Sequence, residues 1–189
     1  MAILVIGLSF FGIGEALLVQ SMLGNSPWTV LAQGVSIKTS LPLGLVTGMI
    51  SVVVLLLWIP LKERPGLGTI SNIIVIPISL QIAITVLPET DSTILGLVFA
   101  LLGVATIGMG SALYISCLLG PGPRDGLMTA LHHRTGIRVG RVRLCIEAVV
   151  FLIGWALGGR IGVGTALFAL LIGQSMAISF GVVSRLTSR

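Results

Sequence analysis

The chain has very few charged residues. Lys, Arg, Asp and Glu make up 9% of its 189 residues, while hydrophobic residues make up 55% and the mean hydropathy is +1.13. A soluble domain carries about 25% charged residues, and a globule of this size could not hide so much apolar surface. The composition therefore excludes a soluble protein. It indicates an integral membrane protein, in which the 25 glycines allow helices to approach closely.

Cysteine is scarce, and motifs for catalysis or metal binding are missing. Cys117 and Cys145 both fall in apolar segments, which excludes a disulfide framework and does not fit a metal site. The adjacent His132 and His133 would point apart on a helix, so they could not readily share a metal. The sequence has no Ser/His/Asp cluster, Walker-type phosphate loop or zinc-ligand spacing. We therefore expect no enzymatic activity, no metal and no cofactor.

Positive charge outweighs negative charge, with 11 Lys and Arg against 6 Asp and Glu. No basic patch is interleaved with aromatic residues, which argues against binding of nucleic acid. The basic residues instead lie at the ends of apolar segments and in loops, where they set the topology of membrane proteins. The expected surroundings are therefore a lipid bilayer.

Six apolar segments approach the length of about 20 residues that a helix needs to cross a bilayer. The fifth is short and begins beside Arg141 and Arg143, whose long side chains can reach the interface. Three segments fall in each half of the chain. The predicted spans are 2–22, 43–61, 69–87, 94–118, 142–158 and 163–184.

The distribution of Lys and Arg predicts the orientation of these spans. Nine of them would share one side of the membrane and two the other, which is a strong positive-inside signal. We therefore expect a multi-pass protein of the bacterial cytoplasmic membrane with both termini in the cytoplasm. The nine are Lys62, Arg64, Arg124, Arg134, Arg138, Arg141, Arg143, Arg185 and Arg189, and the two are Lys38 and Arg160.

The two halves of the chain are copies of each other. The motif Leu23-Gly-Asn-Ser-Pro27 returns as Leu119-Gly-Pro-Gly-Pro123, and Arg64–Thr69 returns as Arg160–Thr165. With an offset of 96 residues, 26 of 93 aligned pairs are identical. Such a repeat decides the fold, so we expect a single membrane domain built from repeat one, 1–93, and repeat two, 97–189.

An odd number of spans in each repeat has a topological consequence. Three crossings reverse the direction of the chain, so the second repeat would lie upside down relative to the first, as in many secondary transporters. The first motif loop, 23–42, would face out with one lysine, and its copy, 119–141, would face in with four arginines. The predicted fold class is therefore an all-α membrane protein of six transmembrane helices, in two inverted-topology three-helix repeats.

Each motif loop also predicts a short extra helix after the first span of its repeat. Ser26 and Gly122 can cap these helices, with Pro27 and Pro123 at the first helical position. The stretches 27–37 and 123–134 are too short to span. They lie in the interface or dip into the protein as re-entrant half-helices. We favour partly embedded helices, since irregular backbone at membrane depth needs cover from protein or a wet cavity.

Under this topology each membrane face presents one motif loop and one glycine turn, and these could act as gates. The outer pair would be 23–27 with 160–165, and the inner pair 119–123 with 64–69. The glycine turns precede the third and sixth spans, where helix N-termini and arginine could bind an anion. The alternative, which we favour, is a tight turn whose arginine meets lipid phosphate. The candidate gate residues are Gly24, Pro27, Trp28, Arg64, Gly66, Gly68, Thr69, Gly120, Pro123, Arg124, Arg160, Gly162, Gly164 and Thr165.

Two carboxylates fall within predicted spans, where charge is costly and indicates function by default. Glu147 follows Arg143 by one helical turn, so a structural ion pair is the favoured interpretation there. Glu15 has no partner nearby in the sequence. It must be protonated, bonded across helices or hydrated in a cavity. Its copy in repeat two is Ser111, so a site at Glu15 would be asymmetric.

Other polar residues fall near the middle of the spans. Ser79 and Ser175 are repeat equivalents, and Pro77 can kink the third span. Transporter sites tend to lie beside such breaks, although ordinary hydrogen bonds between helices are the favoured interpretation. The candidates for a binding site or pathway are Glu15, Gln20, Asn72, Ser79, Gln81, Glu147, Gln174 and Ser175.

The motif loop Leu23-Gly-Asn-Ser-Pro-Trp28, Gly34, Gly44 and the turn Gly66–Thr69 resemble the YczE/YyaS/YitT-like family of small bacterial membrane proteins. The resemblance covers nearly the whole chain and implies a multi-pass protein of the cytoplasmic membrane. It implies no catalytic residues. Repeat two departs from the motif, because Arg124 stands where repeat one has Trp28.

These observations predict a small permease or transporter for a small solute or ion. One alternative is a substrate-binding membrane subunit of an energised complex, and another is an accessory or scaffold protein that transports nothing. The sequence has no ATP site, so energy would come from a gradient or a separate energising subunit. Six spans are few to enclose a pathway, which favours a homodimer. The sequence does not identify the substrate.

Overall fold

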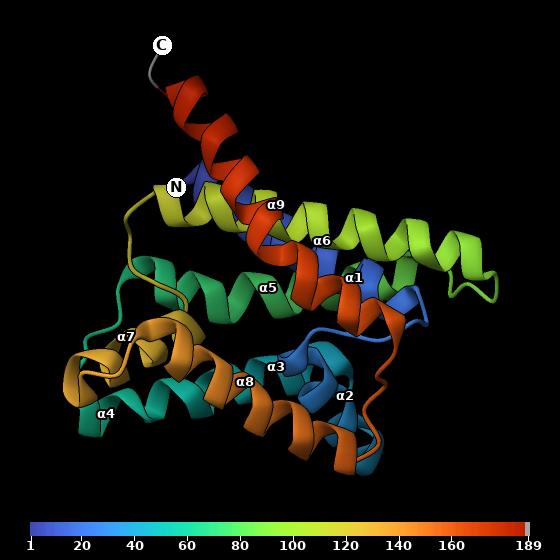
Figure 1. Ribbon diagram of the computed structural model, residues 1–189, viewed down its shortest axis with the longest axis horizontal. Coiled ribbons are helices and arrows are strands. Elements are labelled where there is room, and N and C mark those ends of the chain that lie inside the picture. Colours follow the sequence, from blue (N-terminus) through green and yellow to red (C-terminus); the bar gives the residue numbers. More distant parts are fainter. Residues whose placement is uncertain (188–189) are drawn as a thin grey trace.

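A computed structural model describes residues 1–187, which form nine helices and no strand (Figure 1). Arg189, counted above among the cytoplasmic basic residues, lies outside the described residues. The helices are α1 (Ala2–Gln20), α2 (Pro27–Thr39), α3 (Leu43–Leu56), α4 (Trp58–Leu61), α5 (Leu67–Val86), α6 (Thr93–Ser116), α7 (Pro123–Thr135), α8 (Val139–Ala156) and α9 (Val163–Thr187).

Five helical segments are long and apolar enough to cross a membrane, and they correspond to five of the six predicted spans. The remaining prediction, 142–158, coincides with α8, which is not among the five because it carries Arg141, Arg143 and Glu147. The number of six spans therefore stays a prediction. The five segments are Ala2–Gln20, Leu43–Leu61, Leu67–Val86, Thr93–Ser116 and Val163–Leu186.

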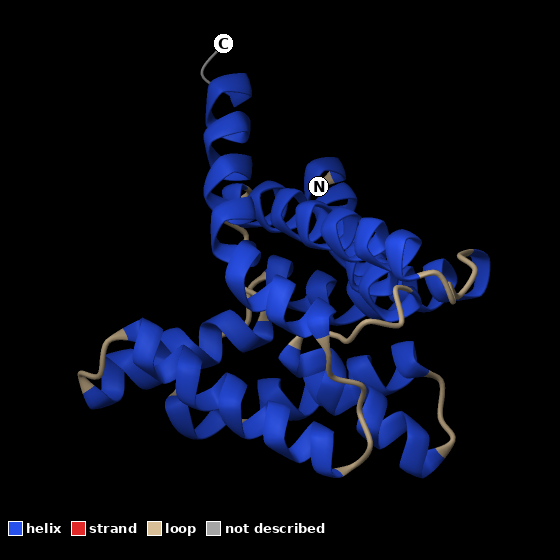
Figure 2. Ribbon diagram, turned by 45° about the vertical axis from the view of Figure 1, so that its right-hand side comes forward, coloured by secondary structure: helices blue, strands red, loops and turns tan. Residues whose placement is uncertain are grey.

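The helices lie in two layers, which Figures 1 and 2 show from two directions. One layer contains α1, α5, α6 and α9, with α1 packed between α5 and α6 and α9 against α6. The other contains α2, α3, α4, α7 and α8, where α2 packs on α8 and α3 on α7. Contacts between α3 and α5 join the layers.

The two halves repeat each other in backbone conformation at the offset of 96 residues. Gly24 and Gly120 have φ values of 114° and 112°, a region that side chains with a Cβ rarely adopt. The short helices α2 and α7 have 13 residues each and both begin at a proline. Figure 1 shows each preceding loop running back toward the middle of the molecule before its short helix begins.

Each motif loop packs against the glycine turn of the other repeat. The Gly164 amide donates to the Leu23 carbonyl oxygen at 2.8 Å, and the Gly68 amide donates to the Leu119 carbonyl oxygen at 2.7 Å. These two hydrogen bonds are repeat equivalents of each other. They join the loops in the two combinations that the repeat predicts, whereas the membrane faces assigned to them stay predictions.

Helices α1 and α6 approach each other closely through two pairs of glycines. A Cβ at Gly110 would lie 2.6 Å from the Gly7 carbonyl oxygen, and a Cβ at Gly14 would lie 2.8 Å from the Gly103 carbonyl oxygen. Gly7 is the repeat equivalent of Gly103, and Gly14 that of Gly110. The contact therefore has the two-fold character of the repeat, and no larger residue fits at its centre.

We expect the Gly14→Val substitution to destabilise the protein by about 1–3 kcal/mol, because the added atoms force the α1–α6 contact apart. Thermal unfolding in detergent measures the effect. The control is Gly181→Ala, since no described atom beyond its own helix backbone lies within 4 Å of a Cβ placed there. A Gly14→Val protein as stable as the control would contradict the role given to this contact.

Candidate functional site

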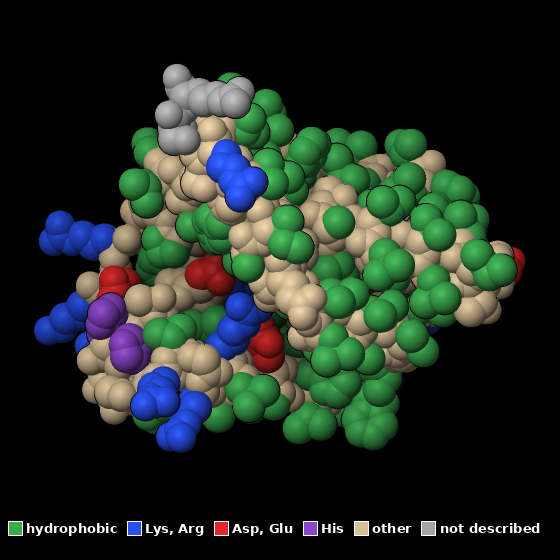
Figure 3. All heavy atoms as spheres, turned by 45° about the horizontal axis from the view of Figure 1, so that its top comes forward, with side chains coloured by type: hydrophobic (Ala, Val, Ile, Leu, Met, Phe, Trp, Pro, Cys, Tyr) green, Lys and Arg blue, Asp and Glu red, His purple; other side chains and the backbone are tan. Residues whose placement is uncertain are grey.

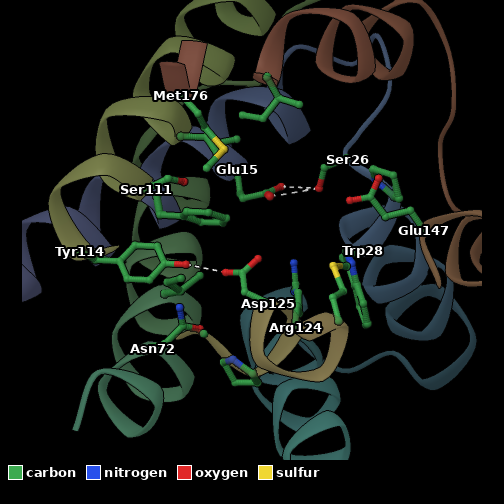
Figure 4. Close-up of a pocket in the computed structure, with 18 of the residues that line it drawn as sticks. Glu15, Ser26, Trp28, Asn72, Ser111, Tyr114, Arg124, Asp125, Glu147 and Met176 are labelled. Carbon is green, nitrogen blue, oxygen red and sulfur yellow. Dashed lines mark hydrogen bonds between the residues drawn. The ribbon is translucent and has the colours of Figure 1, made fainter. Parts of the chain in front are cut away.

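A polar cavity of about 90 Å³ lies where the short helices α2 and α7 begin, beside the middle of α1 and α6 (Figure 4). Five charged residues line it, although the chain is poor in charge. They are Glu15, Arg124, Asp125, Arg143 and Glu147.

Most residues that line the cavity are repeat equivalents of one another. Sixteen of the 22 lining residues form eight pairs separated by 96 positions, so both halves of the chain build the same wall. The pairs are Phe11 and Ile107, Glu15 and Ser111, Ser26 and Gly122, Pro27 and Pro123, Trp28 and Arg124, Ser51 and Glu147, Asn72 and Phe168, and Ile76 and Ile172.

Glu15 is a deeply buried carboxylate of the cavity, with 3% of its surface exposed. Thr29 Oγ1 donates to Glu15 Oε2 at 2.6 Å, and the Ser26 hydroxyl lies 2.9 Å from the same oxygen. Of the three alternatives for Glu15, bonding to another element is confirmed, and Glu15 also lines a cavity. Ser26 is the N-cap residue of α2, but its side chain makes no cap hydrogen bond; its hydroxyl donates to Glu15 instead.

On the opposite wall a hydroxyl again donates to a carboxylate, but the helices that supply the two groups are exchanged. Tyr114 on α6 donates its hydroxyl to Asp125 Oδ2 on α7 at 2.6 Å. Asp125 is the repeat equivalent of Thr29. In repeat one the first span supplies the carboxylate and the short helix the hydroxyls, and in repeat two the roles are reversed.

Arg124 and its repeat equivalent Trp28 meet at the cavity. The guanidinium carbon of Arg124 lies 4.8 Å from the centre of the Trp28 ring, within the range of a cation–π interaction. Burial lowers the pKa of the Arg124 guanidinium from its ordinary value, while the nearby carboxylates of Glu15 and Asp125 act in the opposite direction. An arginine stays protonated under these conditions, so Arg124 is a fixed positive charge.

Glu147 is neutralised within its own helix. Arg143 Nε lies 2.8 Å from Glu147 Oε1, one helical turn away, which confirms the ion pair predicted from their spacing. Both residues also line the cavity. The pair therefore contributes polar groups without adding net charge.

Several polar residues predicted for a pathway lie outside the cavity lining. Gln20 donates to the Ile84 carbonyl oxygen at 3.0 Å, and Ser175 donates to the Val104 carbonyl oxygen at 3.0 Å. The Gln81 side-chain oxygen accepts from the Gly44 amide at 2.8 Å. Ser79 packs beside Gly12, and Gln174 is exposed. Of the pathway candidates, the cavity contains Glu15, Asn72 and Glu147.

The glycine turns use their amides and hydroxyls to hold the motif loops. The Gly68 amide is bonded to Leu119, and the Thr69 hydroxyl donates to the Pro121 carbonyl oxygen at 2.7 Å. Gly66 and Gly68 are needed for close approach to the Leu119–Gly120 backbone, rather than for unusual backbone angles. Arg64 and Arg160 are exposed, which fits the interpretation as tight turns with an arginine at the surface.

Four residues that build the site were not singled out as site residues from the sequence. They are Ser26, Thr29, Tyr114 and Asp125. Position within the motif loops could have indicated Asp125, because it directly follows Arg124. Hydroxyl side chains such as Thr29 carry no comparable signal, since membrane helices commonly bond them to their own backbone.

Two larger hollows are almost wholly apolar. One of about 820 Å³ lies among α2, α3, α7 and α8, and one of about 690 Å³ is a surface groove that runs along the packed helices α3 and α5. Their lining of aliphatic side chains suits lipid chains rather than a polar solute. The polar cavity is therefore the candidate functional site.

The family model and the relatives found by comparison all match nearly the whole chain. Residues 1–180 match a family of unknown function, DUF6198. The chain is 44% identical over 185 residues to an uncharacterized protein of Haemophilus influenzae, covering 98% of this chain and 85% of that one. It is 30% identical to the uncharacterized membrane protein YczE of Bacillus subtilis, covering 92% and 81%, and 27% identical to YyaS of the same organism, covering 95% and 92%. No solved structure matches.

We expect Thr29→Val to lower the free energy of unfolding by about 1–3 kcal/mol, because it leaves the buried Glu15 carboxylate short of a donor. In a Glu15→Leu background the same change costs much less. Unfolding titrations of the four proteins measure this coupling. Thr39→Val is the control, since the Thr39 hydroxyl bonds its own helix at Val35. Equal costs in both backgrounds would disprove the coupling.

Proposed function

The chain belongs to the YczE/YyaS-like family of membrane proteins, and on that premise we propose that it is a permease for a small solute or ion. The observation that carries the proposal is the cavity of paired lining residues around Glu15 and Arg124. Charged groups inside a membrane protein are costly and mark substrate or ion pathways. A scaffold would gain nothing from keeping them beside a cavity.

The proposed architecture is the inverted repeat of six spans, with α8 as the fifth span. Equivalent hydrogen bonds at Gly68 and Gly164 support it, as do the matching glycines of α1 and α6. Figure 3 shows Lys and Arg side chains of the visible face gathered toward one end, which we take as the cytoplasmic end. In this arrangement α2 and α7 are half-helices whose N-termini meet at the cavity, as in known transporter folds.

The helix pairs α3–α5 and α8–α9 are repeat equivalents, and we call the boundary between the two helices of each pair a seam. The α3–α5 seam is closed. In repeat one, α3 packs against α5, and the Gly44 amide donates to Gln81 Oε1 at 2.8 Å. A Cβ at Gly48 would lie 3.6 Å from Pro77 Cβ. In the proposed topology this seam closes the outer half of the protein.

The second seam, between α8 and α9, is open. No described atom beyond the helix's own backbone lies within 4 Å of a Cβ placed at Gly140 or Gly173, which are the repeat equivalents of Gly44 and Pro77. The six lining residues that have no partner in the cavity all come from repeat two. Together these asymmetries support a cavity that is open toward the cytoplasm. The six are Tyr114, Ile115, Asp125, Met128, Arg143 and Met176.

We propose that transport exchanges the states of the two seams. Closing α8 on α9 and opening α3 from α5 would turn the cavity toward the other side of the membrane, as expected for inverted repeats. A substrate-binding subunit or a scaffold needs no such exchange. The state of the α8–α9 seam therefore separates the candidate functions.

We expect a disulfide to form between Leu144→Cys and Gly173→Cys in a Cys117→Ser, Cys145→Ser background. These positions are the equivalents of Gly48 and Pro77, whose separation suits a disulfide. Oxidation in membranes followed by peptide mass spectrometry measures the yield. Gly48→Cys with Pro77→Cys is the positive control, and the exposed pair Leu152→Cys with Leu170→Cys is the negative one. A yield no higher than the negative control would overturn alternating access.

We further propose that Glu15 takes up the proton that couples transport to a gradient. Glu15 is buried and forms no ion pair within the described part of the chain. Arg124 of α7 is the cation whose charge acts on the Glu15 carboxyl group. The yield of the α8–α9 cross-link should then vary with pH, and Glu15→Gln should remove that variation. Ser51→Ala, which changes another cavity residue, is the control. Undiminished pH dependence in Glu15→Gln would exclude this role.

A further inference from the structure

Three charged groups in the cavity lack a direct counter-ion. Glu15 and Asp125 accept hydrogen bonds from neutral hydroxyl groups, and Arg124 contacts the Trp28 ring. None of the three forms an ion pair within the part of the chain that the structure describes. The remaining two charges, Arg143 and Glu147, neutralise each other.

Arg124 and Asp125 lie side by side on α7 and face Glu15 across the cavity. Figure 4 shows Arg124 extending from α7 toward the side where Glu15 lies, with Asp125 and Trp28 on either side of it. Arg124 also begins the first turn of α7 after Pro123, where free backbone amides favour negative charge. The cavity therefore offers a positive and a negative region within one small volume.

We propose that the cavity binds a small zwitterion, with its carboxylate on Arg124 and its ammonium group toward Glu15 and Asp125. The proposal rests on the proposed function, because it names the substrate class of the same cavity. Glu15 is buried, whereas Arg124 is half-buried and Asp125 is exposed. The buried charge of Glu15 needs a partner of opposite sign, and Arg124 and Asp125 line the same cavity. A zwitterion supplies both partners at once.

Other small ligands leave part of this arrangement unsatisfied. A simple carboxylate would pair Arg124 and leave two carboxylates without a cation. A simple ammonium ion would balance the net charge of the three groups, but it would place no carboxylate against Arg124. The one carboxylate in excess of Arg124 is then available for the proton assigned above to Glu15.

The size of the cavity limits the ligand. One water needs about 10–15 Å³ of such space, so about 90 Å³ holds several waters or one solute of a few heavy atoms. Met128, Met176 and Phe168 supply an apolar part of the wall. They suit the short hydrocarbon portion of a small amino acid and exclude large side chains.

The test is a thermal-stability titration of the purified protein with glycine, alanine, β-alanine and glycine betaine. Acetate and methylammonium, at matched ionic strength, are the single-charge probes. A ligand that binds the native state raises its melting temperature. We expect at least one zwitterion to stabilise the protein more than both single-charge probes together.

Arg124→Gln should weaken this binding about tenfold or more, because it removes a charged hydrogen-bond donor. Arg134→Gln is the matched control, since Arg134 lies on the same helix, is exposed and does not line the cavity. Arg124→Lys keeps the charge and should retain part of the binding if Arg124→Gln proves unstable. Binding unchanged in Arg124→Gln would overturn the assignment of the carboxylate.

The other outcomes also decide the matter. Stabilisation by acetate alone would indicate an anion site and by methylammonium alone a cation site, and either overturns the zwitterion, as does no response to any probe. If the α8–α9 disulfide forms but no zwitterion binds, the proposed permease function stands and only its substrate class is refuted. Zwitterion binding to a protein whose seam never closes would refute transport but keep the ligand.

Discussion

The close approach of α1 and α6 is the constraint on which the rest of the structure depends. Gly14 and Gly110 face the opposite helix, and the next residue of each helix, Glu15 or Ser111, lines the cavity. Consecutive side chains on a helix point about 100° apart. A glycine contact at one position thus fixes the direction of a cavity residue at the next.

The repeat could be predicted because geometry requires the same residue type at equivalent positions. Gly24 and Gly120 both adopt positive φ, and the offset between them is visible in the sequence. The charged cavity residues Glu15 and Arg124 could also be predicted, Glu15 because charge is rare in apolar segments and Arg124 because it lies in the repeated motif loop. Hydrogen-bond partners could not, because the roles of Thr29 and Tyr114 arise only from contacts between elements distant in the sequence.

The repeats share a backbone but have different chemistry. Trp28 stands opposite Arg124, and Glu15 is the equivalent of Ser111. The packing of the two repeats differs in a similar way, because a large residue in one repeat corresponds to a small residue in the other. Trp58 fills the space beside Gly126, while its repeat equivalent, Gly154, leaves room for the Val30 backbone. One scaffold therefore supports two unlike walls.

The hydrogen bond from Gly44 to Gln81 has no counterpart in repeat two, where Ala177 occupies the position equivalent to Gln81. A hydrogen bond of this kind contributes about 0.5–1.5 kcal/mol. Under the proposed mechanism the α3–α5 and α8–α9 contacts open and close in turn. This difference then makes the state in which α3 stays packed on α5 about twofold to twelvefold more populated than the other state. In the proposed exchange, this difference between Gln81 and Ala177 makes the state that is open toward the cytoplasm the more populated one.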